Sequence, residues 1–371
     1  MDLLNEFEDA IDAELMGVEA KVLGMIAETL GEVSNGLPAR EALARVSGDV
    51  RKAGKALGDA AEDVQSAADA VEAAIDEANA EWSEPYYAAS GATATKAAAA
   101  IMADARDEAV ELMRNALKTS AVGLTDAGGK NFKPLAEAYR AAVTGVAAKM
   151  RLGEATGEKA VREAVRTLSS GGLRVAYESG RTMELHSAVR MAVVDTFRRG
   201  MGDARAKMGE EFGADGVEIS AHGLCAADHL PYQGRQYAKK AFDKLQSDLE
   251  RPIGEGYNCR HTVFPIIVGV SKPAYTAKEL EEIAKMSTER VSFTVRGEER
   301  EATRYEFTQY QRSLERGIRK ARMTAYVAEK SGVGKAEADR RVRDLLRGYR
   351  TVSKQAGIDT RLERTNLYIP R

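Results

Sequence analysis

Apolar residues recur at intervals of three and four along most of the chain, which is the spacing of an amphipathic α-helix. The pattern begins with Leu3, Leu4, Phe7, Ile11 and Leu15 and continues to about residue 120. Stretches with glycine, proline or asparagine interrupt it at 34–38, 82–85 and 123–129, where we predict helix ends. Residues 1–125 are therefore predicted to form a region of long helices.

One stretch, 60–80, is so rich in alanine that its apolar stripe is thin. A helix of this kind buries little surface by itself, so we expect it to pack closely on a neighbour in a bundle or an oligomer. The pattern leaves open whether that neighbour belongs to the same chain or to another copy of it.

The helical pattern continues with larger side chains at 126–213, with a break at 169–172 and a long helix at 184–208. The period then changes, because Val217, Ile219 and Ala221 alternate with polar residues and an apolar, β-rich run follows at 262–268. Both segments are typical of strands. The charged stretch between them, 238–250, predicts a short helix, and a hairpin is predicted at 291–300 with its turn near Gly297.

The last part of the chain returns to helical spacing. Two charged helices are predicted at 305–330 and 335–356, joined at 331–334, and a tail ends at 369–371. The predicted fold is therefore mainly α, with a long helical N-terminal region, a small central α+β domain with a few short strands, and a C-terminal helical hairpin. The predicted domains are 1–125, 126–213, 214–303 and 304–371.

The composition is that of a globular protein, with 44% hydrophobic and 30% charged residues in 371. The longest apolar runs fall short of the about 18 residues that a membrane span needs. The first residues include acidic side chains where a secretory signal would carry basic ones. We therefore expect no membrane segment and a protein made in a cytoplasm, where two cysteines form no disulfide framework.

Charge is distributed unevenly along the chain. Residues 1–80 hold 18 acidic and 6 basic side chains, whereas residues 301–371 hold 17 basic and 9 acidic ones. Both ends can be read as solvated helical faces. Alternatively, the basic end is a contact surface for nucleic acid or an acidic protein, and the acidic end, which DNA would repel, contacts protein.

Histidine and cysteine gather in one short part of the chain. Of the two cysteines and four histidines, five lie within 40 residues: His222, Cys225, His229, Cys259 and His261. Zinc prefers thiolate and imidazole ligands, and its sites are built from two short ligand groups joined by a loop. Because one residue separates Cys259 from His261, both side chains would lie on one face of a strand. The five residues are predicted to form a metal site, with zinc as the candidate ion.

Two other interpretations of the same residues stay open. The histidine rings could hydrogen-bond to backbone carbonyls while the cysteines act as small buried hydrophobic residues. One cysteine and one histidine could also form a nucleophile pair oriented by Asn258 or Asp228. The signatures of zinc deaminases and metalloproteases are missing, as is a Gly-rich phosphate loop after a strand. The remaining histidine, His186, lies in a predicted helix and is expected to be a surface or packing residue.

Two sequence motifs in this region resemble the phage minor capsid protein 2 family. The first runs from Ala221 to Arg235 and contains Tyr232-Gln233-Gly234, where the family usually has tryptophan in place of Tyr232. The second is Tyr257-Asn-Cys-Arg-His261, which leads into an apolar run with proline. Segments at 269–280 and 310–320 are also similar, so the resemblance covers roughly 130–371.

The resemblance implies a structural protein of a tailed-phage or prophage head, assembled in the bacterial host cytoplasm and located in the virion. It implies attachment near the portal or the major capsid protein, other copies of the chain as partners, and no established catalytic activity. The basic C-terminal helices could then contact packaged DNA. In this family role the His/Cys residues hold the small domain together, while Gln233, Gly234 and Arg260 shape its turn. The competing hypothesis is a metal-assisted hydrolase or nuclease that is carried in the particle.

Overall fold

The computed structural model describes residues 2–126, 130–254 and 259–367. Its helices are α1 (Asp2–Ser34), α2 (Ala39–Ser90), α3 (Ala97–Ala116), α4 (Leu135–Arg151), α5 (Gly157–Gly171), α6 (Leu185–Phe212), α7 (Lys239–Asp248), α8 (Ala277–Thr288), α9 (Arg304–Ser331), α10 (Lys335–Gln355) and the 3₁₀ turn η1 (Leu362–Thr365). Its strands are β1 (Val122–Leu124), β2 (Lys133–Pro134), β3 (Leu173–Ala176), β4 (Thr182–Glu184), β5 (Gly216–Ile219), β6 (Gln236–Ala238), β7 (Val263–Ile266), β8 (Arg290–Val295) and β9 (Glu298–Thr303). The predicted mainly α fold is confirmed.

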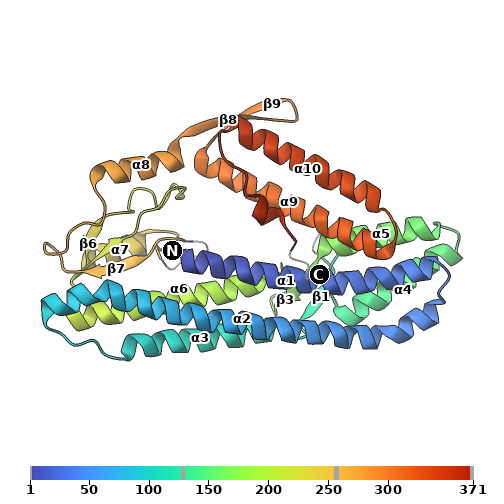
Figure 1. The fold of residues 1–371 in the computed structure, drawn as a ribbon, viewed down its shortest axis with the longest axis horizontal. Helices are drawn as coiled ribbons and strands as arrows, with labels where there is room; N and C mark the ends of the chain where they lie inside the picture. Colours follow the sequence, from blue (N-terminus) through green and yellow to red (C-terminus); the bar gives the residue numbers. More distant parts are fainter. Residues whose placement is uncertain (1, 127–129, 255–258, 368–371) are drawn as a thin grey trace.

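Helix α1 is the centre of a helical body formed by α1–α6. It runs lengthwise beside α2, while the α9–α10 pair is inclined across it (Figure 1). Every residue from Leu15 to Ala20 is buried, as expected for a helix that is covered on all sides. The approach of α9 is close enough that a Cβ atom at Gly31 would overlap the carbonyl of Ser331. One apolar core therefore joins the beginning of the chain to α9.

Helix α2 is longer than the sequence predicts. The predicted helix end at 82–85 is wrong, because α2 continues through Pro85 to Ser90. Proline removes one helical hydrogen bond and adds a clash, but the same turn carries Trp82 and Tyr86, whose rings pack on Phe212 of α6. This packing favours the continuous helix. The helix end predicted at 34–38 is confirmed, as is the end of helical structure before 123–129, of which 127–129 lie outside the described residues.

The alanine-rich part of α2 finds its neighbours within the same chain. Its buried positions follow helical spacing: Ala53, Leu57, Ala60, Val64 and Ala68. Helix α2 contacts α1, α3, α4 and α6. The question that the sequence left open is thus answered for this segment, because small side chains allow these helices to approach one another inside one molecule.

A four-stranded antiparallel sheet in the helical body was missed by the sequence analysis. Its order is β2-β1-β3-β4, and Gly123 of β1 pairs with Arg174 of β3. Each of these strands has two to four residues. An alternation of period two cannot be recognised over so short a length.

We use the name central unit for residues 214–288, which lie at one end of the body (Figure 1). Its sheet has the antiparallel order β6-β5-β7, and the predicted strands, the predicted helix at 238–250 and the predicted hairpin are confirmed. The hairpin turns at Arg296 and Gly297, whose φ angles of 53° and 87° are those of a type I′ turn. Helix α8 was not predicted, although Thr276 and Glu279 form a capping box at its start.

The central unit is joined to the body by a buried arginine. Arg205 of α6 donates a hydrogen bond of 2.9 Å from Nε to Asn79 of α2, and its guanidinium lies 4.7 Å from the ring centre of Phe264 in β7. Trp82 also contacts Phe264, with ring centres 5.5 Å apart. Burial lowers the pKa of Arg205 to about 10. The guanidinium is stabilised by the face of the Phe264 ring and by the side-chain amide of Asn79.

The predicted C-terminal helical hairpin is confirmed as α9 and α10. Its outer end has a small core of its own, in which Phe293 of the β-hairpin packs against Phe307 of α9 and Val352 of α10. The tail predicted at 369–371 lies outside the described residues. No helix within the described ranges is both long enough and apolar enough to span a bilayer. The predicted division into four domains stays a prediction.

Candidate functional site

The topology of the central sheet brings the two halves of the His/Cys group together. His222, Cys225 and His229 follow β5, whereas Cys259 and His261 precede β7. Because β5 and β7 are antiparallel, with Ile219 opposite Val263, the segment after β5 and the segment before β7 lie at the same end of the strand pair. All five residues therefore lie near one another, and the metal site predicted from them stays a prediction.

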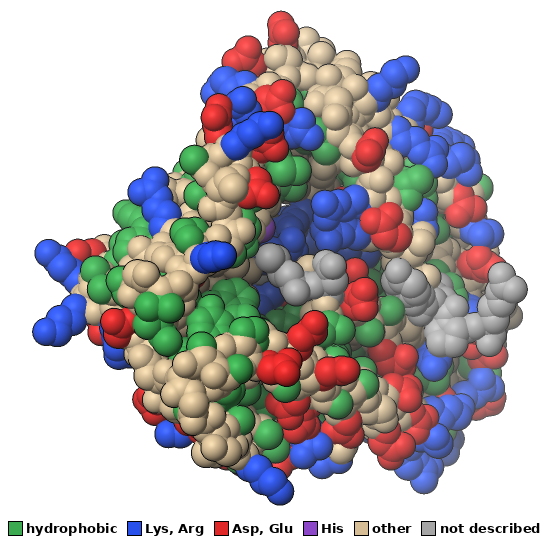
Figure 2. Space-filling view, turned by 60° about the vertical axis from the view of Figure 1, so that its left-hand side comes forward, with side chains coloured by type: hydrophobic (Ala, Val, Ile, Leu, Met, Phe, Trp, Pro, Cys, Tyr) green, Lys and Arg blue, Asp and Glu red, His purple; other side chains and the backbone are tan. Residues whose placement is uncertain are grey.

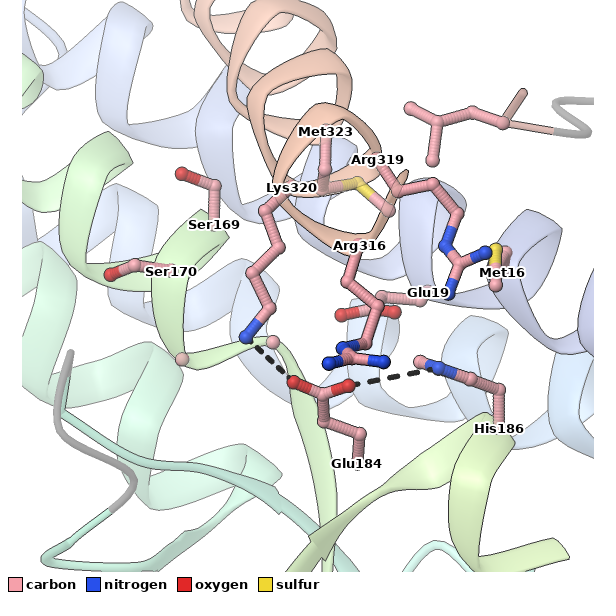
Figure 3. A pocket seen from close by; sticks show the side chains of 13 residues that line it. Met16, Glu19, Ser169, Ser170, Glu184, His186, Arg316, Arg319, Lys320 and Met323 are labelled. Carbon is pink, nitrogen blue, oxygen red and sulfur yellow. Dashed lines mark ion pairs between the residues drawn. The ribbon is translucent and has the colours of Figure 1, made fainter. Parts of the chain in front are cut away.

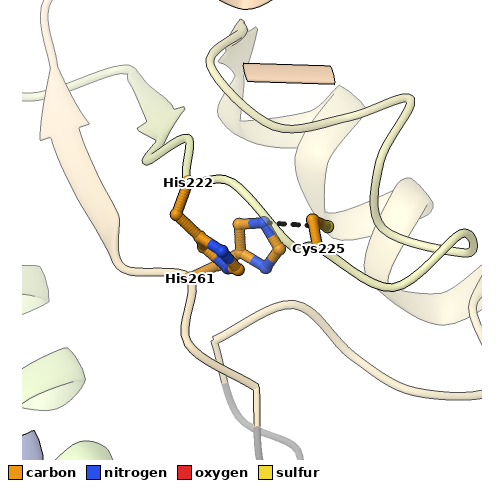
Figure 4. A group of neighbouring side chains, drawn as sticks. All are labelled: His222, Cys225 and His261. Atoms are coloured by element: carbon orange, nitrogen blue, oxygen red, sulfur yellow. Dashed lines mark hydrogen bonds between the residues drawn. The ribbon is translucent and has the colours of Figure 1, made fainter. Parts of the chain in front are cut away.

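The five side chains form two triads that share His261. In the first, Cys225 Sγ lies 3.6 Å from His261 Nε2, and His222 stands beside them (Figure 4). In the second, Cys259 Sγ lies 3.6 Å from His229 Nδ1 and 3.5 Å from His261 Nδ1. Within each triad the potential ligand atoms lie within 4.8 Å of one another. Four donors complete a tetrahedral zinc site, and each triad supplies three of them.

Two backbone carbonyls fix which ring nitrogens are free to bind a metal. His229 Nε2 lies 2.8 Å from the Arg251 carbonyl, and His222 Nδ1 lies 2.9 Å from the Gly223 carbonyl. A carbonyl only accepts, so each of these nitrogens carries the proton and the opposite nitrogen of each ring presents a lone pair. The Nε2 atom of His222 is buried and has no hydrogen-bond partner within the described chain, so its lone pair is available to a metal ion.

Gln233 orients the shared ring of His261. Its Oε1 accepts the backbone N–H of His222 at 3.1 Å and lies 3.2 Å from His261 Nε2. A proton on Nε2 then satisfies the amide oxygen and leaves Nδ1 facing Cys259. Cys259 Sγ also accepts the backbone N–H of Gly254 at 3.3 Å. The triad of His229, Cys259 and His261 therefore has free donor atoms on the inside and hydrogen bonds on the outside, as in known metal sites.

Burial favours the neutral forms of Cys225 and His261. Burial, followed by the nearby Cys259, raises the pKa of Cys225 to about 12. Burial and then the neighbouring histidines lower the pKa of His261 to about 3. Neutral imidazoles are ready ligands, and a bound cation would displace the thiol proton. A thiol that stays protonated at neutral pH is a poor nucleophile, which weighs against a Cys225 nucleophile pair.

Of the two residues offered to orient such a pair, Asp228 lies 3.8 Å from His229 Nε2 but is held more closely by Arg251. Asp228 forms an ion pair of 2.5 Å with the exposed side chain of Arg251, the residue whose carbonyl holds His229. Asn258 lies outside the described residues. Ser287 of α8, which the sequence analysis did not identify, accepts the backbone N–H of Cys225 at 2.9 Å. No sequence motif could have identified it, because the contact depends on how α8 packs.

A second polar pocket lies where α1, α5, α6 and α9 meet (Figure 3). Glu184 lies 2.7 Å from Lys320 and 3.7 Å from His186 Nε2. His186 is only 8% exposed, in agreement with a packing role. Glu19 accepts the backbone N–H of Leu173 at 2.9 Å, and its burial raises its pKa to about 7. Arg316 and Arg319 also line this pocket, which is a polar joint between helices.

Comparison with known proteins identifies one family. A family model described as phage minor capsid protein 2 matches residues 41–351. The match includes the whole His/Cys group; compared with the resemblance at roughly 130–371, it begins further toward the N-terminus and ends at residue 351. No curated protein and no solved structure matches the chain significantly.

Proposed function

Because the chain belongs to the phage minor capsid protein 2 family and is thus a virion component, we propose that it is a non-enzymatic structural protein of the phage head. It attaches to the portal or to the inner face of the major capsid protein and acts while the head is assembled. The observation that carries this proposal is the family match over most of the chain, helical body and central unit together.

The C-terminal helix pair, α9 and α10, supplies a surface for such attachment. Helix α10 exposes a basic face with Arg340, Arg341, Arg343, Arg347 and Arg350. This face is suited to an acidic partner or to the backbone of packaged DNA. If these charges only form a solvated helical face, no partner is expected at α10. Cross-linking in the particle distinguishes a solvated face from a contact surface.

The composition of the particle tests the proposed place of the chain. DNA-filled and empty particles are separated, and this chain is quantified in each against the major shell protein. A fixed low copy number in both populations is expected of a built-in head component. Absence from both populations would overturn the proposal, and cross-links that join the chain only to non-head proteins would overturn the attachment to portal or shell.

Within this role we propose that the His/Cys group holds one structural zinc ion. The support is chemical: two buried thiols, three imidazoles whose outer nitrogens are hydrogen-bonded, and an orphaned inner nitrogen on His222. A bound zinc ion would cross-link the segment that follows β5 to the segment that precedes β7. Elemental analysis of purified protein is expected to give about one zinc per chain, and metal-free protein with unchanged melting would remove the proposal.

A metal-assisted hydrolase is the second candidate. The observation that favours it is the triad of His229, Cys259 and His261, since three protein ligands and an open fourth position are typical of catalytic zinc. A substitution of Cys225, which lies outside this triad, distinguishes the structural site from the hydrolase. Loss of zinc and early melting in Cys225→Ser supports a closed structural site. Full zinc content together with metal-dependent cleavage of DNA or peptidoglycan by the wild type would support the hydrolase.

A further inference from the structure

The outer face of α10 carries a stripe of positive charge. Helix α10 lies at the edge of the molecule, where it packs on α9 and β8 (Figure 1). Five exposed cations follow one another at intervals of three and four residues: Arg340, Arg343, Arg347, Arg350 and Lys354. Residues at this spacing lie along one side of a helix. The stripe therefore runs for about 21 Å at 1.5 Å per residue.

Few carboxylates balance this basic stripe. The helix has three acidic residues, and two of them, Glu337 and Asp339, pair with cations outside the stripe. The third, Asp344, lies 3.4 Å from Arg347. The other four members of the stripe form no ion pair with any residue that the structure describes. Like charges three and four residues apart on a helix repel one another, so an acidic partner would stabilise the stripe.

The second half of α2 presents the opposite charge on an equally open face. From residue 59 to residue 90 the chain has nine acidic residues and no lysine, arginine or histidine. One exposed line of this segment again has intervals of three and four residues: Asp63, Ser66, Ala70, Ala73, Glu77, Ala80 and Glu84. We call it the acidic line. Its three carboxylates form no ion pair within the described part of the chain.

The acidic line and the basic stripe match in length, spacing and side-chain size. The line from Asp63 to Glu84 measures about 32 Å and is therefore longer than the stripe. Its uncharged members are alanine and serine, so a second helix can approach closely and arginine side chains can reach the carboxylates. The shared spacing places charge opposite charge when two helices lie side by side.

The two surfaces do not meet within one molecule. The body holds α2 against α1, α3, α4 and α6, whereas α10 packs on α9 and β8. In Figure 1, α10 lies above α1 and the second half of α2 lies below it. Figure 2 shows a similar separation from another side, with Asp and Glu side chains gathered below the hollow and Lys and Arg side chains at the upper right. A contact between the two surfaces therefore needs two molecules.

We propose that the basic stripe of α10 docks on the acidic line of α2 in a second copy of this chain. Each copy carries both surfaces, so the contact is head-to-tail and leaves one surface free at each end for further copies. Such contacts close into a ring or continue as a filament, depending on the rotation between neighbours. The inference goes beyond the proposed function, since both surfaces belong to this chain and neither depends on attachment to the portal or the shell.

Self-association of the full-length protein is measured by sedimentation velocity over a series of protein concentrations. At low salt the wild type is expected to form species larger than a monomer, which dissociate at high salt because exposed charges are screened. Two double variants reverse one surface each, Arg343→Glu with Arg350→Glu on α10 and Glu77→Lys with Glu84→Lys on α2. Each double variant is expected to weaken association by about tenfold or more, because attraction becomes repulsion at two positions.

A mixture of the two double variants tests the complementarity directly. One variant has two acidic surfaces and the other has two basic surfaces, so neither is expected to associate with itself. Mixed in equal amounts at low salt, they are expected to associate about as strongly as the wild type. A misfolded variant would not regain association in this way, and circular dichroism of each variant checks its fold. A mixture that stays monomeric contradicts the proposal.

The matched control reverses two exposed charges away from both surfaces, Arg151→Glu on α4 with Lys159→Glu on α5, and is expected to associate as the wild type does. A wild type that stays monomeric at low salt overturns the proposal, as does association that neither surface variant weakens. A monomeric wild type that binds duplex DNA, and loses this binding in the α10 variant, overturns it in favour of nucleic acid as the occupant of the basic stripe.

Discussion

The helical body and the central unit are stabilised in different ways. Around α1 the body buries an apolar core that includes Ile11, Leu23 and Phe197, each at most 1% exposed. In the central unit, α7 has no buried residue and α8 has only Ser287. The interior of the unit contains His229, Gln233 and His261 beside a few apolar side chains such as Ile219 and Ile266.

This difference indicates what each region needs in order to fold. Burial of apolar surface stabilises the body without help, since it contributes about 25 cal/mol per Å². The central unit has a small apolar interior, and domains of that kind are usually completed by a metal or a disulfide. Its polar interior is consistent with a region whose folding is coupled to ligand binding, attached to a body whose folding is not.

The largest expected effect follows from the proposed zinc ion, when that ion is removed. Structural zinc contributes about 10–16 kcal/mol of apparent binding energy in small domains, so a chelator, or Cys259→Ser, is expected to unfold the central unit while the body persists. Hydrogen exchange measured along the chain checks this, with loss of protection in β5 and β7 and continued protection in α1. Unchanged protection in β5 and β7 after chelation would contradict it.

A cavity in the core of the body is expected to act on the whole molecule. Leu23→Ala removes a fully buried side chain from α1, and truncations of this kind cost about 2–5 kcal/mol. Urea unfolding followed by circular dichroism measures the loss. Leu112→Ala on α3, where the side chain is 39% exposed, is the control and is expected to change stability far less. Equal effects of the two variants would mean that α1 is not the centre of the core.

Buried Glu19 gives the body a dependence on pH. Burial raises its pKa from 4.5 to about 7, so between these values the folded chain keeps a proton that the unfolded chain has lost. The contribution of protonated Glu19 to the free energy of unfolding is fully present below pH 4.5. It is lost as the pH rises to about 7, and the loss amounts to about 3 kcal/mol. Glu19→Gln keeps an acceptor for the Leu173 N–H and is expected to be the more stable protein at pH 8.

Urea unfolding of the wild type and Glu19→Gln at pH 5 and pH 8 measures this difference. Glu6→Gln, an exposed carboxylate on the same helix, is the control and is expected to leave the pH dependence as it is. A Glu19→Gln protein with the same pH dependence as the wild type would show that Glu19 is ionised in the fold at neutral pH.

The smallest expected effects come from helix caps. Thr303 accepts the N–H of Glu306 at the start of α9, and Thr276 accepts that of Glu279 at the start of α8. Replacing either threonine by alanine costs about 1 kcal/mol. We expect Thr303→Ala to lower global stability, because α9 enters the main core, and Thr276→Ala to alter only local hydrogen exchange in α8. Thr351→Ala on the exposed face of α10 is the control.

Much of this fold could be predicted from the sequence because its helices are long. The spacing of apolar residues identified α6, α9 and α10 to within a few residues. The errors occurred where tertiary contacts outweighed local signals, as at Pro85, where Trp82 and Tyr86 hold the helix together. The short strands of the first sheet had too few residues to show a period.

The His/Cys group could be predicted because its residues are rare and close in sequence. Their convergence followed from two strands that pair side by side. The groups around them had no such signal, since Gln233 orients His261 through a single oxygen and the Arg251 residue contributes only its carbonyl.

The contact between α1 and α9 has a consequence for the timing of synthesis. Glu28 pairs with Lys330, a residue 302 positions later in the chain. At about 5–20 residues per second, a ribosome needs about 15–60 s to make the segment between them. Throughout that interval α1 has been synthesised but α9, which buries part of its apolar surface, has not. The nascent chain must keep this apolar helix from aggregating, and the body can close only when translation has nearly ended.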